Sequence, residues 1–306
     1  MSASQDRILV TGANGHLGRR LLRHLAGERA LRAAVRSERA AAAVRAEGTE
    51  PAPELRIVDP CDAAALGEAA GGCTHAVHLV GILKESRSSR YAQAHEESCE
   101  ALARAAEAAG LRRVVYLSIL GSRPDAENAC LASKGRAERI LLAGRTPALV
   151  LRVPMVLGEG DLAARALRRE ALAPAALLVR GGACREQPIY AGDLVLAIAR
   201  ALDLAGGGEA LDLAGPESLT HRELVLRAAR LLGRRPLVLP LPRAVAMAGA
   251  GLAERLLADP PLTRAMLGVL DRDDRVDPAG ACRRLGIALT PLDEMLRRCV
   301  VHADAA

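Results

Sequence analysis

A glycine-spaced turn near the start of the chain constrains the fold more than any other sequence feature. Residues 7–25 read RILVTGANGHLGRRLLRHL: an apolar strand-like segment, a turn with three glycines, then leucines at helical spacing. Gly12 allows a sharp exit from the strand, Gly15 lets backbone approach a phosphate, and Gly18 lets the helix pack closely. The helix N-terminus offers free N–H groups and a partial positive charge to an anion. The pattern therefore predicts a seat for a dinucleotide pyrophosphate. We expect this seat to be lined by Thr11, Gly12, Asn14, Gly15, His16, Leu17 and Gly18.

The spacing of these glycines is G-x-x-G-x-x-G, whereas the general dinucleotide fingerprint is G-x-G-x-x-G. An ordinary turn between a strand and a helix is therefore the alternative interpretation. The place of the turn, directly after an apolar strand and before an amphipathic helix, favours the dinucleotide seat.

Strand-like and helix-like segments alternate along the first half of the chain. Further strands are predicted at 31–35, 55–58, 76–80, 113–118 and 147–153. Helices are predicted between them at 63–70, 93–109 and 129–143. This alternation predicts an α/β fold with a Rossmann-type, doubly wound and mostly parallel sheet.

The pattern changes after residue 160. Short strands are predicted at 177–179, 188–190 and 210–213, and helices at 162–172, 194–202 (started by Asp193), 221–232, 244–257, 263–270 and 292–300. We expect residues 1–160 to form the NAD(P)-binding domain, completed by about 185–214. Residues 161–306 are expected to form a smaller, mostly helical C-terminal lobe, interleaved with that domain, at the carboxyl ends of the sheet.

Composition excludes several classes of protein. Acidic and basic residues are interspersed, the net charge is +6, and Trp and Phe are absent, so the chain has no stacking platform or dense basic run for nucleic acid. An anionic ligand such as NADP is enough to account for the basic balance. Seven cysteines without C-x-x-C spacing, and no signal-peptide pattern, predict a cytoplasmic protein without a structural metal. No window has the roughly 18 apolar residues of a spanning helix.

The residues after the predicted second strand bear on the choice of cofactor. Arg36 and Ser37 lie where an arginine accommodates a 2′-phosphate and an acid instead binds a free 2′-hydroxyl. They predict NADP(H) rather than NAD(H). Two alternatives stay open, because Glu38 could reach a 2′-hydroxyl and Arg36 could simply be solvated.

Other strand ends supply the remaining candidates for cofactor binding. Asp59 follows the third strand and could accept from the adenine amino group, whereas Asp62 is predicted to cap the next helix. Val80 and Gly81 follow the fourth strand, where a glycine leaves room for the nicotinamide half. Pro154, after the sixth strand, completes the predicted set. The polar segment 84–92 is predicted to be a mobile loop over the site.

Several segments together resemble a known superfamily. They are TGANGHLG, the S-x-x-G of residues 118–121, CLASKGRAE at 130–138, the L-R-x-P of residues 151–154 and QPIYAGDL at 187–194. These resemble the extended or atypical short-chain dehydrogenase/reductase superfamily, of the NAD(P)-dependent epimerase/dehydratase kind. More narrowly, HLVGILKE, YLSILG, LTRAMLGVLDRDD and LGIALTPLDEML are similar to bacterial relatives of the nucleotide-binding accessory subunit of NADH–ubiquinone oxidoreductase. That narrower resemblance implies peripheral association with a membrane respiratory complex.

The resemblance also implies an active site. The superfamily uses a Tyr-x-x-x-Lys pair, with a serine at the preceding strand end, and the lysine binds the nicotinamide ribose and lowers the pKa of the tyrosine. Lys134 matches the lysine, Ser118 the serine, and Ser133 the serine often found before the lysine. Cys130 stands in the tyrosine position, one helical turn from Lys134. The chain therefore keeps the ribose-binding half of the motif and lacks the proton-transfer half.

Three hypotheses follow for the chemistry. The favoured one is an NADP(H)-binding protein with weak or no conventional dehydrogenase activity, acting structurally or as a sensor. In the second, Tyr91, Tyr190 or Ser118 supplies the acid, and the chain is an oxidoreductase or epimerase acting on a small or quinone-like substrate. In the third, Lys134 lowers the pKa of Cys130, which is itself reactive.

Two further interpretations concern residues outside that motif. An interaction protein of a respiratory complex would dock through the predicted helix at 244–257. His78 and His95 are interpreted as structural residues. Of the 42 basic residues only Lys84 and Lys134 are lysines, which singles out Lys134 as a residue with a role of its own.

Overall fold

The computed structural model describes residues 6–86, 89–257, 260 and 262–301. The chain divides into two compact units, Met1–Arg152 with Val195–Leu211, and Val153–Leu194 with Asp212–Ala306. The sequence prediction put the boundary at residue 160 and assigned about 185–214 to the first domain. Each unit has a hydrophobic core of its own.

The first unit is built on a seven-stranded sheet of order β11-β6-β5-β4-β1-β2-β3. The strands are β1 Arg7–Thr11, β2 Ala30–Val35, β3 Glu54–Ile57, β4 His75–His78, β5 Arg113–Ile119, β6 Ala148–Val153 and β11 Glu209–Asp212. The pairs β1–β2, β1–β4, β2–β3 and β4–β5 are parallel. This order, which reverses beside β1, confirms the predicted Rossmann-type, doubly wound sheet.

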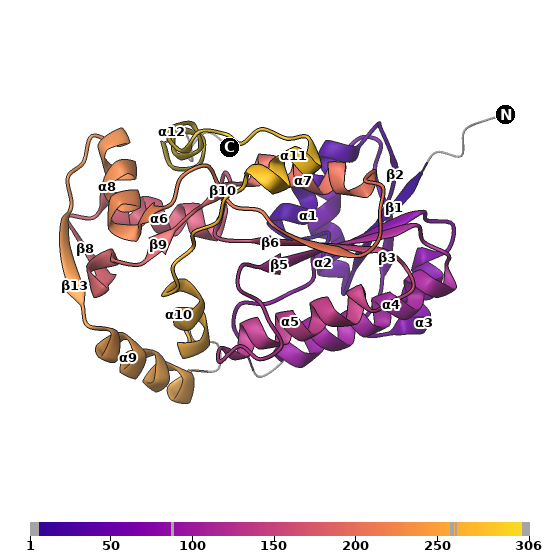
Figure 1. Ribbon diagram of the computed structural model, residues 1–306, viewed down its shortest axis with the longest axis horizontal. Helices are drawn as coiled ribbons and strands as arrows, with labels where there is room; N and C mark the ends of the chain where they lie inside the picture. Colours follow the sequence, from indigo (N-terminus) through magenta and orange to yellow (C-terminus); the bar gives the residue numbers. More distant parts are fainter. Residues whose placement is uncertain (1–5, 87–88, 258–259, 261, 302–306) are drawn as a thin grey trace. The chain divides into compact units, whose positions relative to one another are not determined.

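Helices cover both faces of this sheet. They are α1 His16–Leu25, α2 Glu38–Arg45, α3 Ala63–Ala70, the π-helical η1 Ala92–Glu97, α4 Ser98–Ala108, α5 Ala129–Leu142 and α7 Ala191–Leu202. Helices α3, α4 and α5 lie together along one face, with α1 on the other (Figure 1). Asp62 caps α3 as predicted, accepting hydrogen bonds from the amides of residues 64 and 65.

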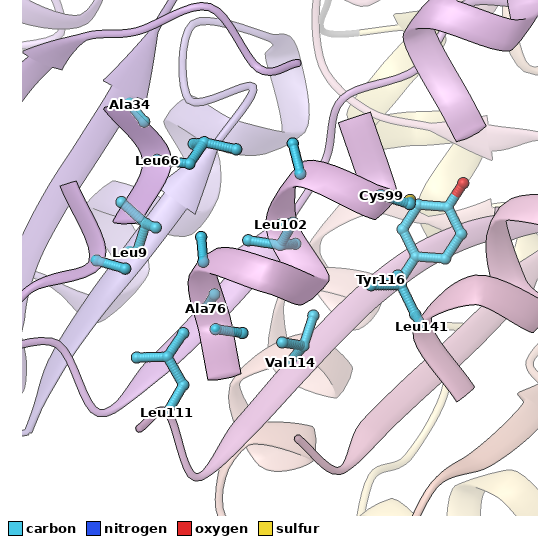
Figure 2. Packing of buried hydrophobic residues seen from close by; sticks show 14 of the residues in the cluster. Leu9, Ala34, Leu66, Ala76, Cys99, Leu102, Leu111, Val114, Tyr116 and Leu141 are labelled. Carbon is cyan, nitrogen blue, oxygen red and sulfur yellow. The ribbon is translucent and has the colours of Figure 1, made fainter. Parts of the chain in front are cut away.

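The core between the sheet and α3–α5 is almost entirely aliphatic. Leu66 and Leu102 of the helices pack against Leu9 and Val114 of the strands, as Figure 2 shows. Tyr116 on β5 is the one aromatic residue of this cluster, and it is fully buried. Tyr116 lies two residues before Ser118 on the same strand, so this end of the core adjoins a predicted site residue.

The second unit combines helices with short strands. Its helices are α6 Leu162–Leu172, the 3-10 turn η2 Arg180–Gly182, α8 His221–Leu231, α9 Arg243–Leu256, α10 Arg264–Leu270, α11 Ala279–Leu285, α12 Leu292–Leu296 and the π-helical η3 Arg297–Val301. Its strands are β7 Val156–Leu157, β8 Ala175–Val179, β9 Arg185–Glu186, β10 Ile189–Tyr190, β12 Leu219–Thr220 and β13 Leu237–Leu241. Thr220 and Glu223 form a capping box at the start of α8.

Three details of this part of the chain differ from the sequence prediction. Strand β13 was not predicted; it pairs in parallel with β8, although Pro240 within it argues against a strand. Helix α11 was also missed. Helix α7 begins at Ala191, before Asp193, whose carboxylate accepts hydrogen bonds from the amide and hydroxyl of Thr290 instead of starting a helix.

The described residues also bear on the predictions about a membrane and a metal. No described helix is long and apolar enough to cross a membrane. Among the same residues, no group of three or more His, Cys, Asp or Glu side chains could hold a metal ion. The predicted mobile loop at 84–92 includes residues 87–88, which lie outside the described part of the chain.

Candidate functional site

The turn between β1 and α1 leaves no room for a side chain at two of its glycines, and the helix that follows presents backbone N–H groups that suit an anion. Gly12 has φ +69°, and a methyl group on it would lie 2.8 Å from the carbonyl carbon of Leu79. A methyl group on Gly18 would lie 2.6 Å from the oxygen of Gly12. Helix α1 has no side-chain cap and no acidic residue in its first turn. Its free N–H groups therefore suit a pyrophosphate, which is the fit that a dinucleotide requires.

Thr11 faces the sheet interior rather than the turn. Its hydroxyl is 2.7 Å from Nδ1 of His78, and Nε2 of His78 is 3.2 Å from the hydroxyl of Ser98. Burial, with a smaller effect of Lys134, lowers the pKa of His78 to about 3. His78 is therefore a neutral, structural residue that fixes the end of β1. Asn14, Gly15 and His16 are exposed in the turn and Leu17 is half-buried.

The end of β2 presents an exposed cation. In the described part of the chain the Arg36 guanidinium has no hydrogen-bond or ion-pair partner, and it follows Val35 directly. Ser37 caps α2 by accepting from the amide of Ala40. The carboxylate of Glu38 pairs with Arg45 at 2.5 Å. Glu38 is thus engaged along its own helix, while Arg36 is open to an anionic group.

The predicted binding residues at the other strand ends differ in exposure and in hydrogen bonding. Asp59 is exposed, and one of its oxygens accepts from the amide of Cys61. Val80 is half-buried and Gly81 exposed just after β4. Pro154 belongs to the second unit and follows β6 directly in the chain.

Lys134 lies buried at the ends of β4 and β5. Its Nζ donates to the carbonyl oxygen of Leu117 at 3.0 Å and lies 4.5 Å from the centroid of the Tyr116 ring. A methyl group on Gly81 would lie 2.9 Å from this nitrogen, so the glycine makes room for the lysine. Burial lowers the pKa of Lys134 to about 8. The structure thus brings the predicted pair Gly81 and Lys134 together.

Cys130 lies one turn before Lys134, but its thiol is not activated. Asn128 caps α5 through the amide of Cys130, and Sγ of Cys130 donates to the oxygen of Ile82 at 3.7 Å. Burial raises the pKa of Cys130 to about 11, outweighing the opposite effects of Lys134 and of a hydrogen bond from Tyr91. The prediction that Lys134 lowers this pKa is therefore wrong in its net direction, because spacing reveals the neighbour but not the desolvation.

The two serines of the predicted motif differ in their hydrogen bonding. Ser118 is 1% exposed near the end of β5, and its hydroxyl has no hydrogen-bond partner among the described residues. Ser133 instead donates to Glu96, which also pairs with Arg136. Ser118 thus has a buried hydroxyl with no partner among the described residues, whereas Ser133 joins α5 to η1.

Sequence reasoning missed the supports of this site. The Lys134 ammonium lies over the ring of Tyr116, and Arg152 on β6 donates three hydrogen bonds of 2.7, 2.9 and 3.1 Å to Glu138 on α5. The importance of Tyr116 could have been suspected from the sequence, because the chain has only three tyrosines and no Phe or Trp. The pairing of Glu138 with Arg152 depends on the packing of α5 on β6, which the spacing of residues in the sequence does not reveal.

Comparisons with known proteins agree with this geometry. A family model described as NAD(P)H-binding matches residues 12–170. A mitochondrial protein of Arabidopsis thaliana, NADH dehydrogenase [ubiquinone] 1 alpha subcomplex subunit 9, is 28% identical over 78% of this chain, which spans 61% of that relative. The ceramide reductase of Caulobacter vibrioides is 28% identical over 77% of this chain and 73% of its own length. Among solved structures, the UDP-glucose 4-epimerase of Thermus thermophilus in complex with NAD has a TM-score of 0.73 at 19% identity, covering 98% of this chain and 99% of its own.

Proposed function

This chain belongs to the NAD(P)H-binding family and is an atypical short-chain dehydrogenase/reductase; from that premise we propose that it binds NADP(H) in preference to NAD(H). The observation that carries the preference is Arg36, exposed and unpartnered at the end of β2 in the described chain. The acid that could compete, Glu38, is paired with Arg45. An arginine at this strand end suits a 2′-phosphate.

Different residues of the chain bind different parts of the dinucleotide. The free N–H groups at the start of α1 bind the pyrophosphate, and Lys134 Nζ donates to the hydroxyls of the nicotinamide ribose. Ser118 offers an unpartnered hydroxyl at the neighbouring strand end. The reduced cofactor, when bound, supplies a hydride. Cys130 keeps its proton, because burial holds its pKa near 11, so no conventional acid acts from that position.

Titration calorimetry with NADPH and NADH tests this proposal. We expect NADPH to bind about tenfold or more tightly, the ratio that roughly 1.4 kcal/mol of additional binding energy gives. Arg36→Ala should remove most of that advantage while leaving NADH affinity unchanged. Arg104→Ala, an exposed arginine on α4, is the matched control. Equal affinity for the two cofactors, or tighter NADH binding, would contradict the proposal.

A second candidate function has an observation of its own. Helix α9 exposes an apolar stripe in which Val245, Leu252 and Leu256 are 56%, 57% and 73% exposed. The plant relative is named as a subunit of NADH dehydrogenase. An accessory protein that docks on a respiratory complex through α9 would lose co-fractionation with respiratory membranes when Leu252 and Leu256 are changed to Ser, with NADPH binding unaffected. We propose a cytoplasmic location in either case, with the seven cysteines as thiols.

A further inference from the structure

Tyr91, at the start of η1, is held in a single position beside the predicted site. Its hydroxyl donates to the carbonyl oxygen of Leu83 at 2.8 Å, and its amide donates to Glu85 at 2.9 Å. Its ring stacks on His95 with the centroids 5.6 Å apart. The residue is 6% exposed. A tyrosine fixed at three points, with its hydroxyl on the segment that follows β4, is well placed to present a proton.

The Tyr91 side chain also lies beside residue 130, where the superfamily motif has its tyrosine. It favours the thiolate form of Cys130, and its ring stacks on His95, whose Nε2 is 3.1 Å from the oxygen of Ile82. Cys130 in turn contacts the oxygen of Ile82, and Lys134 follows one turn along α5. Tyr91, through His95, and Cys130 thus meet at the backbone oxygen of Ile82, and residue 130 itself brings no phenol to this position.

We propose that Tyr91 supplies the hydroxyl that residue 130 lacks, and acts as the general acid when a carbonyl compound is reduced with bound NADP(H). This inference rests on the proposed function, since it needs the dinucleotide in its seat. The reduced nicotinamide, when bound, would supply a hydride to the carbonyl carbon, be oxidised in doing so, and send the electron pair of the C=O π bond to oxygen. Tyr91 would donate its hydroxyl proton to that oxygen. The Tyr91 phenolate would then regain a proton from water.

The other two tyrosines are engaged differently. Tyr116 is fully buried in the core beneath Lys134, and burial raises its pKa well above the usual value. Tyr190 donates its hydroxyl to Glu159 at 2.5 Å within the second unit. Tyr91 alone combines a fixed hydroxyl with a contact to residue 130.

Tyrosine NMR tests the placement without turnover. The chain contains three tyrosines and no Trp or Phe, so protein labelled at the hydroxyl-bearing ring carbon gives three signals, assigned with single Tyr→Phe variants. NADPH should shift the Tyr91 signal, whereas 2′-phospho-ADP-ribose, which lacks the nicotinamide, should not. If calorimetry shows that NADPH binds and the Tyr91 signal does not move, the inference is wrong and the proposed function stands. If NADPH does not bind, both fail.

Turnover tests the chemistry. Tyr91→Phe keeps the ring and its stacking on His95 but removes the proton, so NADPH-dependent reduction of small carbonyl or quinone probes should fall about 100-fold. The dissociation constant for NADPH should stay within about twofold, since no binding contact is lost. Tyr190→Phe is the matched control and should retain wild-type turnover.

Two outcomes of the turnover experiment would overturn the inference. One is wild-type turnover in Tyr91→Phe. The other is a wild type that reduces none of the probes while Cys130→Tyr, combined with Tyr91→Ala to make room, reduces them. If neither protein reduces any probe, the NMR result decides.

Discussion

A single buried lysine links the fold to the cofactor. Forty-two residues of the chain are basic, yet the cation placed beside Gly81 is one of only two lysines. A compact ammonium fits there, where the ring of Tyr116 and the oxygen of Leu117 replace part of its hydration. Burial makes the charged form harder to keep, which lowers its pKa to about 8. The charge of Lys134 is therefore adjustable near neutral pH.

This adjustability predicts a pH dependence of cofactor binding. Below about pH 7 Lys134 is charged and donates to the ribose, and as the pH rises through about 8 it loses that proton. NADPH affinity, measured by calorimetry, should therefore be flat at low pH and fall severalfold between about pH 7 and 9. Lys134→Met should bind more weakly at every pH and lack the fall, and Lys84→Met should keep the wild-type profile. An identical profile in Lys134→Met would show that another group titrates.

At the scale of elements, α5 is the helix that positions the site. Its first turn is capped by Asn128, and Glu96 on η1 bonds both Ser133 and Arg136. At its middle, Glu138 forms a two-point pair with Arg152 on β6, with the glutamate side chain 3% exposed. Bidentate pairs of this kind fix geometry as well as energy. The part of α5 that carries residues 130 and 134 is thus anchored by contacts both before and after it in the chain.

Removing the buried partner should therefore be costly. Glu138→Gln removes the buried negative charge that pairs with Arg152, and we expect the free energy of unfolding to fall by about 3 kcal/mol in denaturant titrations. Glu107→Gln breaks an exposed pair with Arg145, in which the side chains are 49% and 85% exposed, and should cost less than about 0.5 kcal/mol. Equal losses in the two variants would mean that the Glu138–Arg152 pair does not anchor α5.

The elements of the first unit were largely predictable, because their signals are local. Apolar periodicity predicted 31–35 for a strand that spans Ala30–Val35, and the predicted helix at 63–70 has the observed bounds. Strand β13 was missed because Pro240 weakens the pattern, and its stability comes from pairing with β8, far away in sequence. The π-helical η1 was predicted as the start of one long helix, because apolar spacing does not distinguish the two.

The site was predictable only where backbone conformation decides it. Glycine spacing indicated the tight turn after β1, and β2 ends at Val35, directly before Arg36, as the apolar run predicted. The state of Cys130 was not predictable, since its burial depends on the packing of α5 near Ile82. The contact of Tyr91 with Cys130 likewise joins residues 39 positions apart through tertiary structure.

At the scale of the whole molecule, each unit has a core of its own, and the second unit also contains a histidine paired with two carboxylates. In the second unit His221 lies between two carboxylates, with Nε2 3.0 Å from Glu170 and Nδ1 3.0 Å from Glu186. Burial alone would lower the pKa of His221, but the hydrogen bonds with both glutamates outweigh it and raise the pKa to about 10. This imidazolium holds α8 to α6 and β9.

The raised pKa predicts a pH-dependent stability. A histidine that binds its proton more tightly when folded stabilises fully below its unfolded pKa of about 6.5, and this contribution is lost as the pH rises through about 10. The thermal midpoint of the second unit should therefore fall between pH 7 and 10. His221→Ala should be roughly 2 kcal/mol less stable at pH 6 and lack this dependence. His24→Ala, an exposed histidine on α1, should match wild type; the same pH dependence in His221→Ala would contradict the assignment.

An experimental structure of the protein with NADPH tests the central claim most directly. Our account predicts density for the pyrophosphate at the N-terminus of α1 over Gly12 and Gly15, and for the 2′-phosphate within hydrogen-bond distance of Arg36. It also predicts a ribose hydroxyl on Nζ of Lys134. Density for the dinucleotide elsewhere, or a 2′-phosphate that points away from Arg36 into solvent, would contradict it.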